Sequence, residues 1–331
     1  MIQLLDCTLR DGAHVNSGHF GRSCIKKLAW GLSDSGIDIA EIGFLKNGEY
    51  NPDLSYYPKI EYALDILDGV NEHTGTEYAL MARADEYDIR QLSECCGKIS
   101  LIRIAFYIDY LDEAVKFAKE ISARGYKFTL NLINTPGSSD YDLMRAADYA
   151  CEIKPYVMTI VDTFGVLMRP ELEHILSIYD KHLDKGITLG LHAHENLSLA
   201  FSLAQYFVNT MNAKRNIAVD GSLMGIGRAP GNLCTELISS WLNQNYRKNY
   251  NVMKFLQLMQ DEIVPMRKKF VWGYSPAYFL SAKYKVHRSY AEYLSGKGFR
   301  LDDIDRILSR IDAKHSGKFS REYVASLSEE E

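Results

Sequence analysis

The sequence predicts an α/β fold, a (β/α)8 TIM barrel followed by an α-helical C-terminal extension. Over about the first 240 residues, eight short apolar runs alternate with longer amphipathic stretches, and strands that alternate with helices favour parallel crossovers. Eight such units suit the roughly 250 residues of a typical closed barrel. The alternative is an open doubly wound sheet, but no glycine-rich dinucleotide fingerprint follows the first run.

Each apolar run has the length of a buried strand. The predicted strands are residues 2–6, 37–44, 77–82, 99–106, 126–133, 156–162, 187–194 and 216–223. Between them, stretches such as 24–36 and 110–125 carry apolar residues three and four positions apart, which predicts amphipathic helices. Four of the strands follow within two residues of a glycine that can end the preceding helix, namely Gly36, Gly97, Gly125 and Gly186.

The alternation of apolar runs and amphipathic stretches ends at about residue 249. Helical patterns cover residues 252–270, 275–294 and 301–315, with no strand pattern between them. We therefore expect a barrel domain over residues 1–246 that carries the chemistry, and an α-helical extension over residues 247–331.

Composition narrows the classes of partner. The net charge is −5 and there is no basic run, so nucleic acid and anionic membrane are not expected as partners. The N-terminus has no basic region before an apolar core, and no apolar run approaches the ~18 residues of a membrane span. The six cysteines form no C-x-x-C pattern, which is typical of free thiols in a reduced, cytoplasmic protein.

Catalytic groups in a barrel lie at the carboxyl ends of its strands. The polar residues at or inside the predicted strand ends are Arg10, Asp11, His14, Glu41, Arg83, Asp85, Arg103, Asn131, Asn134, Asp162, His192, His194 and Asn232. Two of them, His192 and His194, are two residues apart in a strand and so point to the same face. That spacing lets two imidazoles share a metal ion, for which Asp11 or Asp162 would supply an oxygen ligand.

Two further features have two readings each. Glu41 could hold the guanidinium of Arg10 in a fixed orientation, or the two could form a plain ion pair between strands. The stretch "GIGRAPGN" could bind phosphate, or it could be a tight turn that brings Asn232 to the barrel mouth.

Four stretches together resemble the DRE-TIM metallolyases, a family that includes 3-hydroxy-3-methylglutaryl-CoA lyase, the isopropylmalate and homocitrate synthases, and 4-hydroxy-2-oxovalerate aldolase. They are "LLDCTLRDGAH", "AEIGF", "GLHAHENLSLA" and "GIGRAPGN". Where the synthases read D-G-E-Q, this chain reads "DGAH", as in the aldolase branch, and "HAHENLSL" also follows the aldolase spelling.

The resemblance implies a role for each site residue. Asp11, His192 and His194 are the implied ligands of a divalent metal, with Mn²⁺ favoured over Mg²⁺, Co²⁺ or Zn²⁺. Arg10 is the implied stabiliser of an enolate with Glu41 as its partner, and His14 is the implied catalytic base. Asn232 matches an Asn at or near the metal, and "WGYSPAYFLSAKY" is similar to an aldolase segment that places a tyrosine over the active site. Tyr278 is the first candidate for that tyrosine, and Tyr274 is the second, which we place with Asn232 and Arg10 in substrate binding.

The implied activity is a metal-dependent aldolase, a carbon–carbon lyase that cleaves or forms a 4-hydroxy-2-oxo acid from pyruvate and an aldehyde. The alternatives are an acyl-CoA-dependent Claisen condensing enzyme of the isopropylmalate or homocitrate synthase type, and a non-catalytic barrel that binds a metabolite. The family also implies a homo-oligomer. The rest of the extension differs from the region that docks an aldehyde dehydrogenase in the aldolases, which leaves that partner and the aldehyde open.

Overall fold

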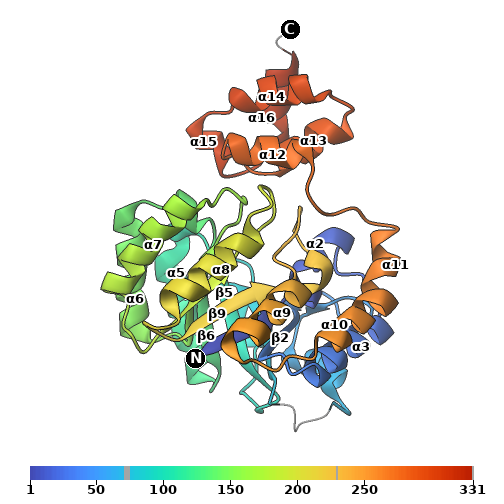
Figure 1. The fold of residues 1–331 in the computed structure, drawn as a ribbon, viewed down its shortest axis with the longest axis vertical. Helices are drawn as coiled ribbons and strands as arrows, with labels where there is room; N and C mark the ends of the chain where they lie inside the picture. The colour runs from blue at the N-terminus through green and yellow to red at the C-terminus, as the bar shows by residue number, and fades with distance from the viewer. Residues whose placement is uncertain (71–74, 229, 330–331) are drawn as a thin grey trace.

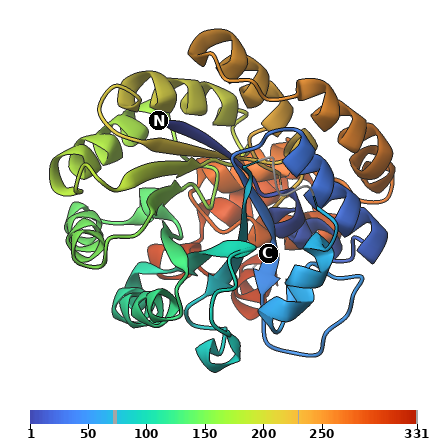
Figure 2. The same ribbon diagram turned by 90° about the horizontal axis from the view of Figure 1, so that it is seen from below.

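Parallel strands close into a barrel at the centre of the chain, seen end-on in Figure 2. The computed structural model describes residues 1–70, 75–228 and 230–329. Within these residues the barrel strands are, in spatial order, β1 (Ile2–Asp6), β9 (Ile217–Gly221), β8 (Thr188–His192), β7 (Val157–Val161), β6 (Lys127–Leu132), β5 (Ile99–Phe106), β4 (Glu77–Arg83) and β2 (Ile39–Leu45). Pairing of Leu5 with Ile39 closes the ring between β1 and β2, and the short β3 (Tyr56–Tyr57) pairs in parallel with the end of β2. The predicted barrel is confirmed, with every strand within two residues of its expected ends.

Helices surround the strands on the outside of the barrel (Figure 2). In chain order they are α3 (Arg22–Asp34), α4 (Ile60–Leu64), α5 (Leu111–Ala123), α6 (Asp140–Ile153), α7 (Arg169–His182), α8 (Ala200–Met211) and α9 (Thr235–Tyr246). The connection from β4 to β5 has only a 3₁₀ turn, Ile89–Gln91. Of the four glycines expected to turn the chain back, Gly36, Gly97 and Gly125 adopt positive φ, which a residue with a side chain rarely does, whereas Gly186 does not.

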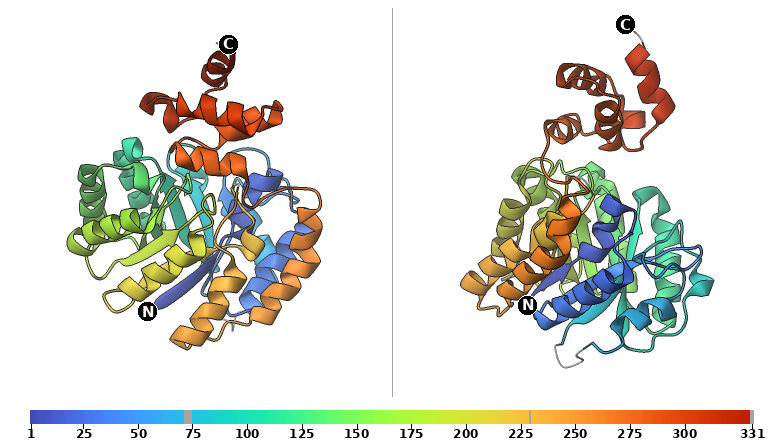
Figure 3. Two further views of the ribbon diagram at one scale, coloured as in Figure 1. Left: turned by 45° about the horizontal axis from the view of Figure 1, so that its top comes forward. Right: turned by 90° about the vertical axis from the view of Figure 1, so that its right-hand side faces the viewer.

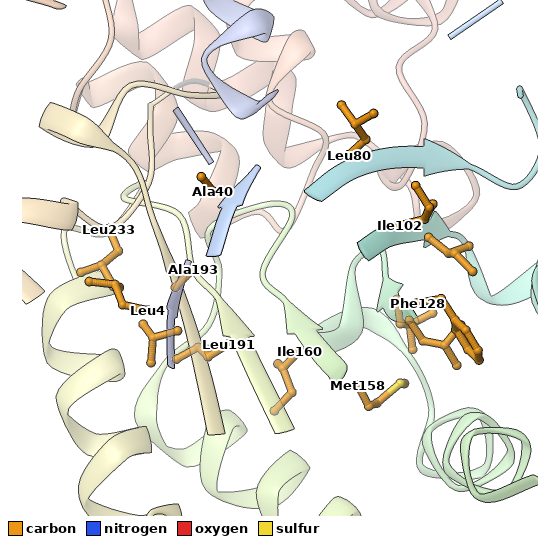
Figure 4. Packing of buried hydrophobic residues seen from close by; sticks show 14 of the residues in the cluster. Leu4, Ala40, Leu80, Ile102, Phe128, Met158, Ile160, Leu191, Ala193 and Leu233 are labelled. Carbon is orange, nitrogen blue, oxygen red and sulfur yellow. The ribbon is translucent and has the colours of Figure 1, made fainter. Parts of the chain in front are cut away.

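Strand alternation divides the buried side chains into two sets. One set, including Leu4, Leu80 and Ile102, belongs to the large core cluster that also contains residues of the surrounding helices (Figure 4). The other set faces the barrel axis, where Leu5, Ile39, Ala79 and Leu101 form a small apolar cluster with Cys7. Glu41 of β2 and Arg103 of β5 come two residues after Ile39 and Leu101 and lie on the same face. The apolar cluster therefore forms the floor of a polar site.

The helices after residue 247 pack in two groups. The first comprises α10 (Val252–Leu258), a π-helical turn (Met259–Ile263) and α11 (Val264–Arg267), whose Phe255, Leu258 and Ile263 join the barrel's core cluster. The second has a hydrophobic cluster of its own and is called the cap here. The cap consists of α12 (Pro276–Lys283), α13 (Ser289–Gly296), α14 (Leu301–Ser309), α15 (Ala313–Ser316) and α16 (Arg321–Glu329).

The cap lies over the carboxyl ends of the barrel strands (Figures 1 and 3). Phe164 after β7 contacts the ring of His287 edge to face, and Asn196 after β8 donates a hydrogen bond to the carbonyl oxygen of Tyr278. Trp272 belongs to the barrel's core cluster, whereas Leu280 belongs to the cluster of the cap. The predicted domain boundary after residue 246 therefore stays a prediction. In the described part of the chain, no helix has the length and apolar character needed to cross a membrane.

Candidate active site

The chain turns into the barrel mouth directly after β1. Two short helical turns, α1 (Thr8–Asp11) and α2 (Ala13–Asn16), follow the strand and bring Arg10 and Asp11 to the barrel interior, where both are buried. Gly12 has an ordinary helical φ of −58°, so the turn does not depend on its conformational freedom. It provides space instead, because a Cβ at this position would lie 2.3 Å from the carbonyl oxygen of Thr8.

Two arginines and three carboxylates form a continuous chain of ion pairs across the barrel, called the charge chain here. Arg10 donates to Asp11 Oδ2 through Nη1 at 2.5 Å and to Glu41 Oε2 through Nε at 2.7 Å. Glu41 Oε2 also accepts from Arg103 Nη1 at 2.9 Å, and Arg103 Nη2 donates to Asp220 Oδ2 at 2.5 Å. All five side chains are buried, and with one carboxylate in excess the chain has a surplus negative charge that a cation would offset.

Both histidines of the H-x-H pair are held through Nδ1. His192 Nδ1 lies 3.1 Å from Asp220 Oδ2, and His194 Nδ1 lies 2.8 Å from the carbonyl oxygen of Asp162. An acceptor at Nδ1 holds a proton there and leaves Nε2 as the atom that can bind a metal, the arrangement found in metal-binding histidines. His192 Nε2 lies 3.2 Å from Asp11 Oδ2, while the buried His194 Nε2 has no hydrogen-bond partner among the described residues.

These donors fit a divalent metal. The ring centroids of His192 and His194 are 4.9 Å apart, and Asp11 supplies a carboxylate beside them. The Oδ1 atom of Asn232 is a second buried acceptor that lacks a hydrogen-bond partner in the residues described. Two imidazole nitrogens with carboxylate and amide oxygens suit Mn²⁺, Mg²⁺, Co²⁺, Fe²⁺ and Zn²⁺ alike.

Two other groups near the histidines are less suited to bind the metal. Cys7 was not predicted as a ligand, yet its Sγ and donor atoms of Asp11 and His192 all lie within 4.8 Å of one another, a cluster that does not include His194. Burial raises the pKa of the Cys7 thiol well above its ordinary value, so the thiol stays protonated and donates to a carbonyl oxygen of β9. Asp162, the alternative carboxylate, accepts two backbone amides of its own loop at 2.9 and 3.2 Å.

The pKa shifts favour the metal-binding forms of Asp11 and His194, whereas the hydrogen bonds of His192 with Asp11 and Asp220 outweigh burial and raise the pKa of His192, whose proton a metal would have to displace. Burial alone would raise the pKa of Asp11, but the charge of Arg10 and the hydrogen bond from His192 hold it well below its ordinary value. Burial and the neighbouring His192 lower the pKa of His194 to about 3. At neutral pH Asp11 is therefore ionised and His194 is neutral.

A cavity of about 100 Å³ lies above these groups. Five of the predicted site residues line it: Arg10, Asp11, His14, His192 and His194. Further lining residues that sequence analysis gave no role include Phe44, Tyr107 and Arg228.

His14 lies on the cavity wall, its ring edge to face with Phe44 at 5.7 Å between centroids. Enclosure by protein lowers its pKa, as do Arg228 and Arg10, while Asp11 acts in the opposite direction. The side chain stays exposed to water in the cavity, which limits the effect of enclosure. The shift is downward from the ordinary near-neutral value, so His14 is a neutral imidazole at pH 7 and can accept a proton.

Two predicted residues lie just behind the cavity surface. Glu41 reaches the site only through its bonds to Arg10 and Arg103, so the predicted Arg10–Glu41 pair is present. Asn232 lies under the glycine-rich loop, where a Cβ at Gly227 would be 2.1 Å from Asn232 Nδ2 and 2.8 Å from Asp11 Oδ1. This close approach favours the tight-turn reading of the loop.

The two predicted tyrosines lie in and beside the cap and do not line the described cavity. The hydroxyl of Tyr278 donates to Glu292 Oε1 at 3.1 Å, and Tyr274 is exposed. Their places over the active site therefore stay predictions.

Sequence analysis does not predict the charge chain as a whole. Arg103 was noted inside its strand without a role, and Asp220 was not singled out. The available signal was a charged residue in the middle of an apolar strand, "ISLIRIAF" and "NIAVDGSL". A buried charge of this kind needs a partner, and here each has a partner on another strand.

The fold and the site define a class: (β/α)8 barrels with donors that suit a divalent metal at the carboxyl ends of the strands. Comparison with known proteins gives the family. The HMGL-like family matches residues 1–261, and the chain belongs to it.

Curated relatives match most of the chain, and solved structures share its fold. The 4-hydroxy-2-oxovalerate aldolase of Pelotomaculum thermopropionicum is 25% identical over 326 residues, covering 93% of this chain and 89% of the relative. The N-terminal domain of a proposed aldolase from Bacteroides vulgatus superposes with a TM-score of 0.78 at 21% identity, covering 92% of this chain and 99% of that one. The HMG-CoA lyase of Bacillus subtilis superposes with a TM-score of 0.63 at 17% identity, covering 81% and 93%.

Proposed function

We propose that this protein is a divalent-metal-dependent aldolase, a carbon–carbon lyase that cleaves or forms a 4-hydroxy-2-oxo acid from pyruvate and an aldehyde. The observation that carries the proposal is the convergence on one cavity of Asp11, the Nε2 atoms of His192 and His194, Arg10 and His14. Several relatives named 4-hydroxy-2-oxovalerate aldolase, at 22–25% identity, support the same activity.

Asp11, His192 and His194 would hold the metal, with Asn232 beside it. The chemistry that a bound divalent ion supplies there is Lewis acidity toward the carboxylate and keto oxygens of a 2-oxo acid. Asp220 and the carbonyl of Asp162 orient the two imidazoles through their Nδ1 atoms.

Arg10 stabilises the negative charge that develops on the keto oxygen as the C3–C4 bond breaks. Its guanidinium is fixed by Asp11 on one side and Glu41 on the other, so little reorganisation is needed when that charge appears. Glu41 is in turn held by Arg103, which extends the support across the barrel.

His14 takes the proton of the C4 hydroxyl in cleavage and returns it in condensation. In cleavage the electron pair of the C3–C4 bond passes to C3, the aldehyde leaves, and protonation of C3 gives pyruvate. The neutral imidazole that the lowered pKa provides is the form that can accept this proton.

The finer assignments belong to the proposal as well. Mn²⁺ is the metal we favour, and pyruvate is the 2-oxo acid. All six cysteines are free thiols in the structure, which supports a reducing cytoplasmic compartment. A homo-oligomer and an aldehyde dehydrogenase partner stay open proposals, to be tested by sedimentation and co-purification.

The test is pyruvate release from 4-hydroxy-2-oxopentanoate, followed with lactate dehydrogenase, after chelation and after return of Mn²⁺. We expect activity only with metal, and His14→Ala should cut kcat at least about 100-fold while the metal content is unchanged. Loss of metal in that variant would make His14 a ligand and refute its role as base. Consumption of acetyl-CoA with a 2-oxo acid, without pyruvate release, would replace the aldolase by a Claisen condensing enzyme.

A further inference from the structure

Four arginines line the cavity in the described structure, and they differ in their partners. Arg10, Arg83 and Arg103 each pair with two carboxylates. Arg228 pairs with no carboxylate in the residues described: its Nη2 lies 2.7 Å from Nε2 of His287, and its buried Nε has no hydrogen-bond partner. One positive charge in the cavity wall is therefore without a counterion.

The cap adds to this positive charge. Burial and the charge of Arg288 lower the pKa of Arg228 to about 10, at which the guanidinium is still charged at neutral pH. Glu292, the carboxylate on this side of the cap, is already bonded to Arg288 and to the hydroxyl of Tyr278. Arg228 is half-buried, and an enclosed charge without an opposite partner is costly, a cost that is met at sites where a ligand supplies the opposite charge.

Arg228 spans the distance from the metal ligands to the cap. Its backbone N donates to Asp11 Oδ1 at 2.6 Å, whereas its guanidinium contacts His287 of the cap. In the proposed function, on which this step rests, the 2-oxo acid end of the substrate lies beside Asp11 and Arg10. An anion at the guanidinium of Arg228 would therefore belong to the opposite end, which leaves as the aldehyde.

We propose that Arg228 binds an anionic group at the far end of the aldehyde, so that the second substrate is a carboxylated or phosphorylated aldehyde and not a neutral alkanal. Carboxylate and phosphate both match the paired N–H donors of a guanidinium. The anionic group takes no part in the bond changes, and Arg228 acts only in recognition.

The experiment compares matched aldehydes in condensation with pyruvate on the Mn²⁺-loaded protein. One pair is butanal and 4-oxobutanoate, which tests a carboxylate, and the other is glyceraldehyde and glyceraldehyde 3-phosphate, which tests a phosphate. We expect kcat/KM to be at least about 10-fold higher for the anionic member of one pair, the scale of a hydrogen bond to a charged group.

The variant Arg228→Met should lower that anionic-to-neutral ratio by about 10-fold, and Arg228→Lys should lower it less, because a point charge remains without the paired donors. Metal content should match the unmodified protein, since only the backbone of Arg228 contacts Asp11. Lys314→Met is the control, an exposed cation on the cap at the rim of an adjoining cavity, which should leave the ratio within about twofold.

An unmodified protein that turns over the neutral aldehydes as well as the anionic ones, with a ratio unchanged in Arg228→Met, overturns this inference and leaves the aldolase standing. Absence of turnover with every aldehyde refutes the aldolase instead. In that case binding of inorganic phosphate, measured by calorimetry, still decides the anion site. We expect about tenfold weaker binding in Arg228→Met, and equal binding in both proteins overturns the site.

Discussion

Asp220→Asn is the change that most directly probes the charge chain. Asp220 Oδ2 accepts from Arg103 Nη2 at 2.5 Å and contacts His192 Nδ1 at 3.1 Å, so one atom supports both a buried cation and a predicted metal ligand. The amide keeps the shape of the carboxylate but removes its charge. The variant should therefore lose stability and metal affinity together.

The size of each loss follows from the partners that remain. Removing one partner of a buried ion pair costs about 3–5 kcal/mol, and Arg103 keeps Glu41 and Asn131, so we expect about 3 kcal/mol. Loss of the carboxylate behind His192 should weaken metal binding about 10- to 100-fold, as for other residues that orient a ligand.

The assays are urea unfolding of the metal-free protein and a chelator competition for Mn²⁺. The matched control is Asp180→Asn, a surface carboxylate near Lys185 and Lys214, which should cost under about 1 kcal/mol and leave metal affinity unchanged. If Asp220→Asn unfolds and binds Mn²⁺ as the unmodified protein does, the charge chain has neither of the roles given to it here.

Three further changes test other parts of the structure. Gly227→Ala should displace Asn232, because the new Cβ would lie 2.1 Å from its Nδ2, and metal analysis should find at least about a tenfold loss of affinity; full metal occupancy would contradict the tight-turn reading. Burial raises the pKa of Asp6 from 3.8 to about 6, so the folded state holds this proton more tightly than the unfolded state. The resulting stability is present below pH 4 and is lost as pH rises through 6. Over this range the free energy of unfolding should fall by about 3 kcal/mol relative to that of Asp6→Asn. A difference between the two proteins that does not change with pH would refute the shift. Phe255→Ala should destabilise the barrel by about 3–5 kcal/mol in thermal unfolding, because this fully buried ring belongs to the barrel core. A loss of stability confined to the cap would show that α10 packs with the cap instead.

The barrel and the inner part of the site could be predicted because both depend on short-range patterns. Alternating apolar runs and amphipathic stretches fixed the strands to within two residues. The two-residue spacing of His192, the last residue of β8, and His194 just beyond it predicted that both side chains face the same cavity, and both line it.

The remaining features depend on contacts between distant parts of the chain. The Arg103–Asp220 pair joins residues 117 positions apart, and Arg228 meets His287 across 59 positions. No local pattern encodes such pairs. The position of Tyr278 is similar, because its contact with Glu292 follows from how α12 packs on α13 within the cap.

The most direct test of the central claim is a titration of Mn²⁺ into metal-free protein with pyruvate release from 4-hydroxy-2-oxopentanoate as the readout. The account predicts that activity rises linearly and reaches its plateau at one ion per chain, and that His194→Ala shows neither the binding nor the activity. Pyruvate release that is independent of added metal, or that survives in His194→Ala, would contradict it.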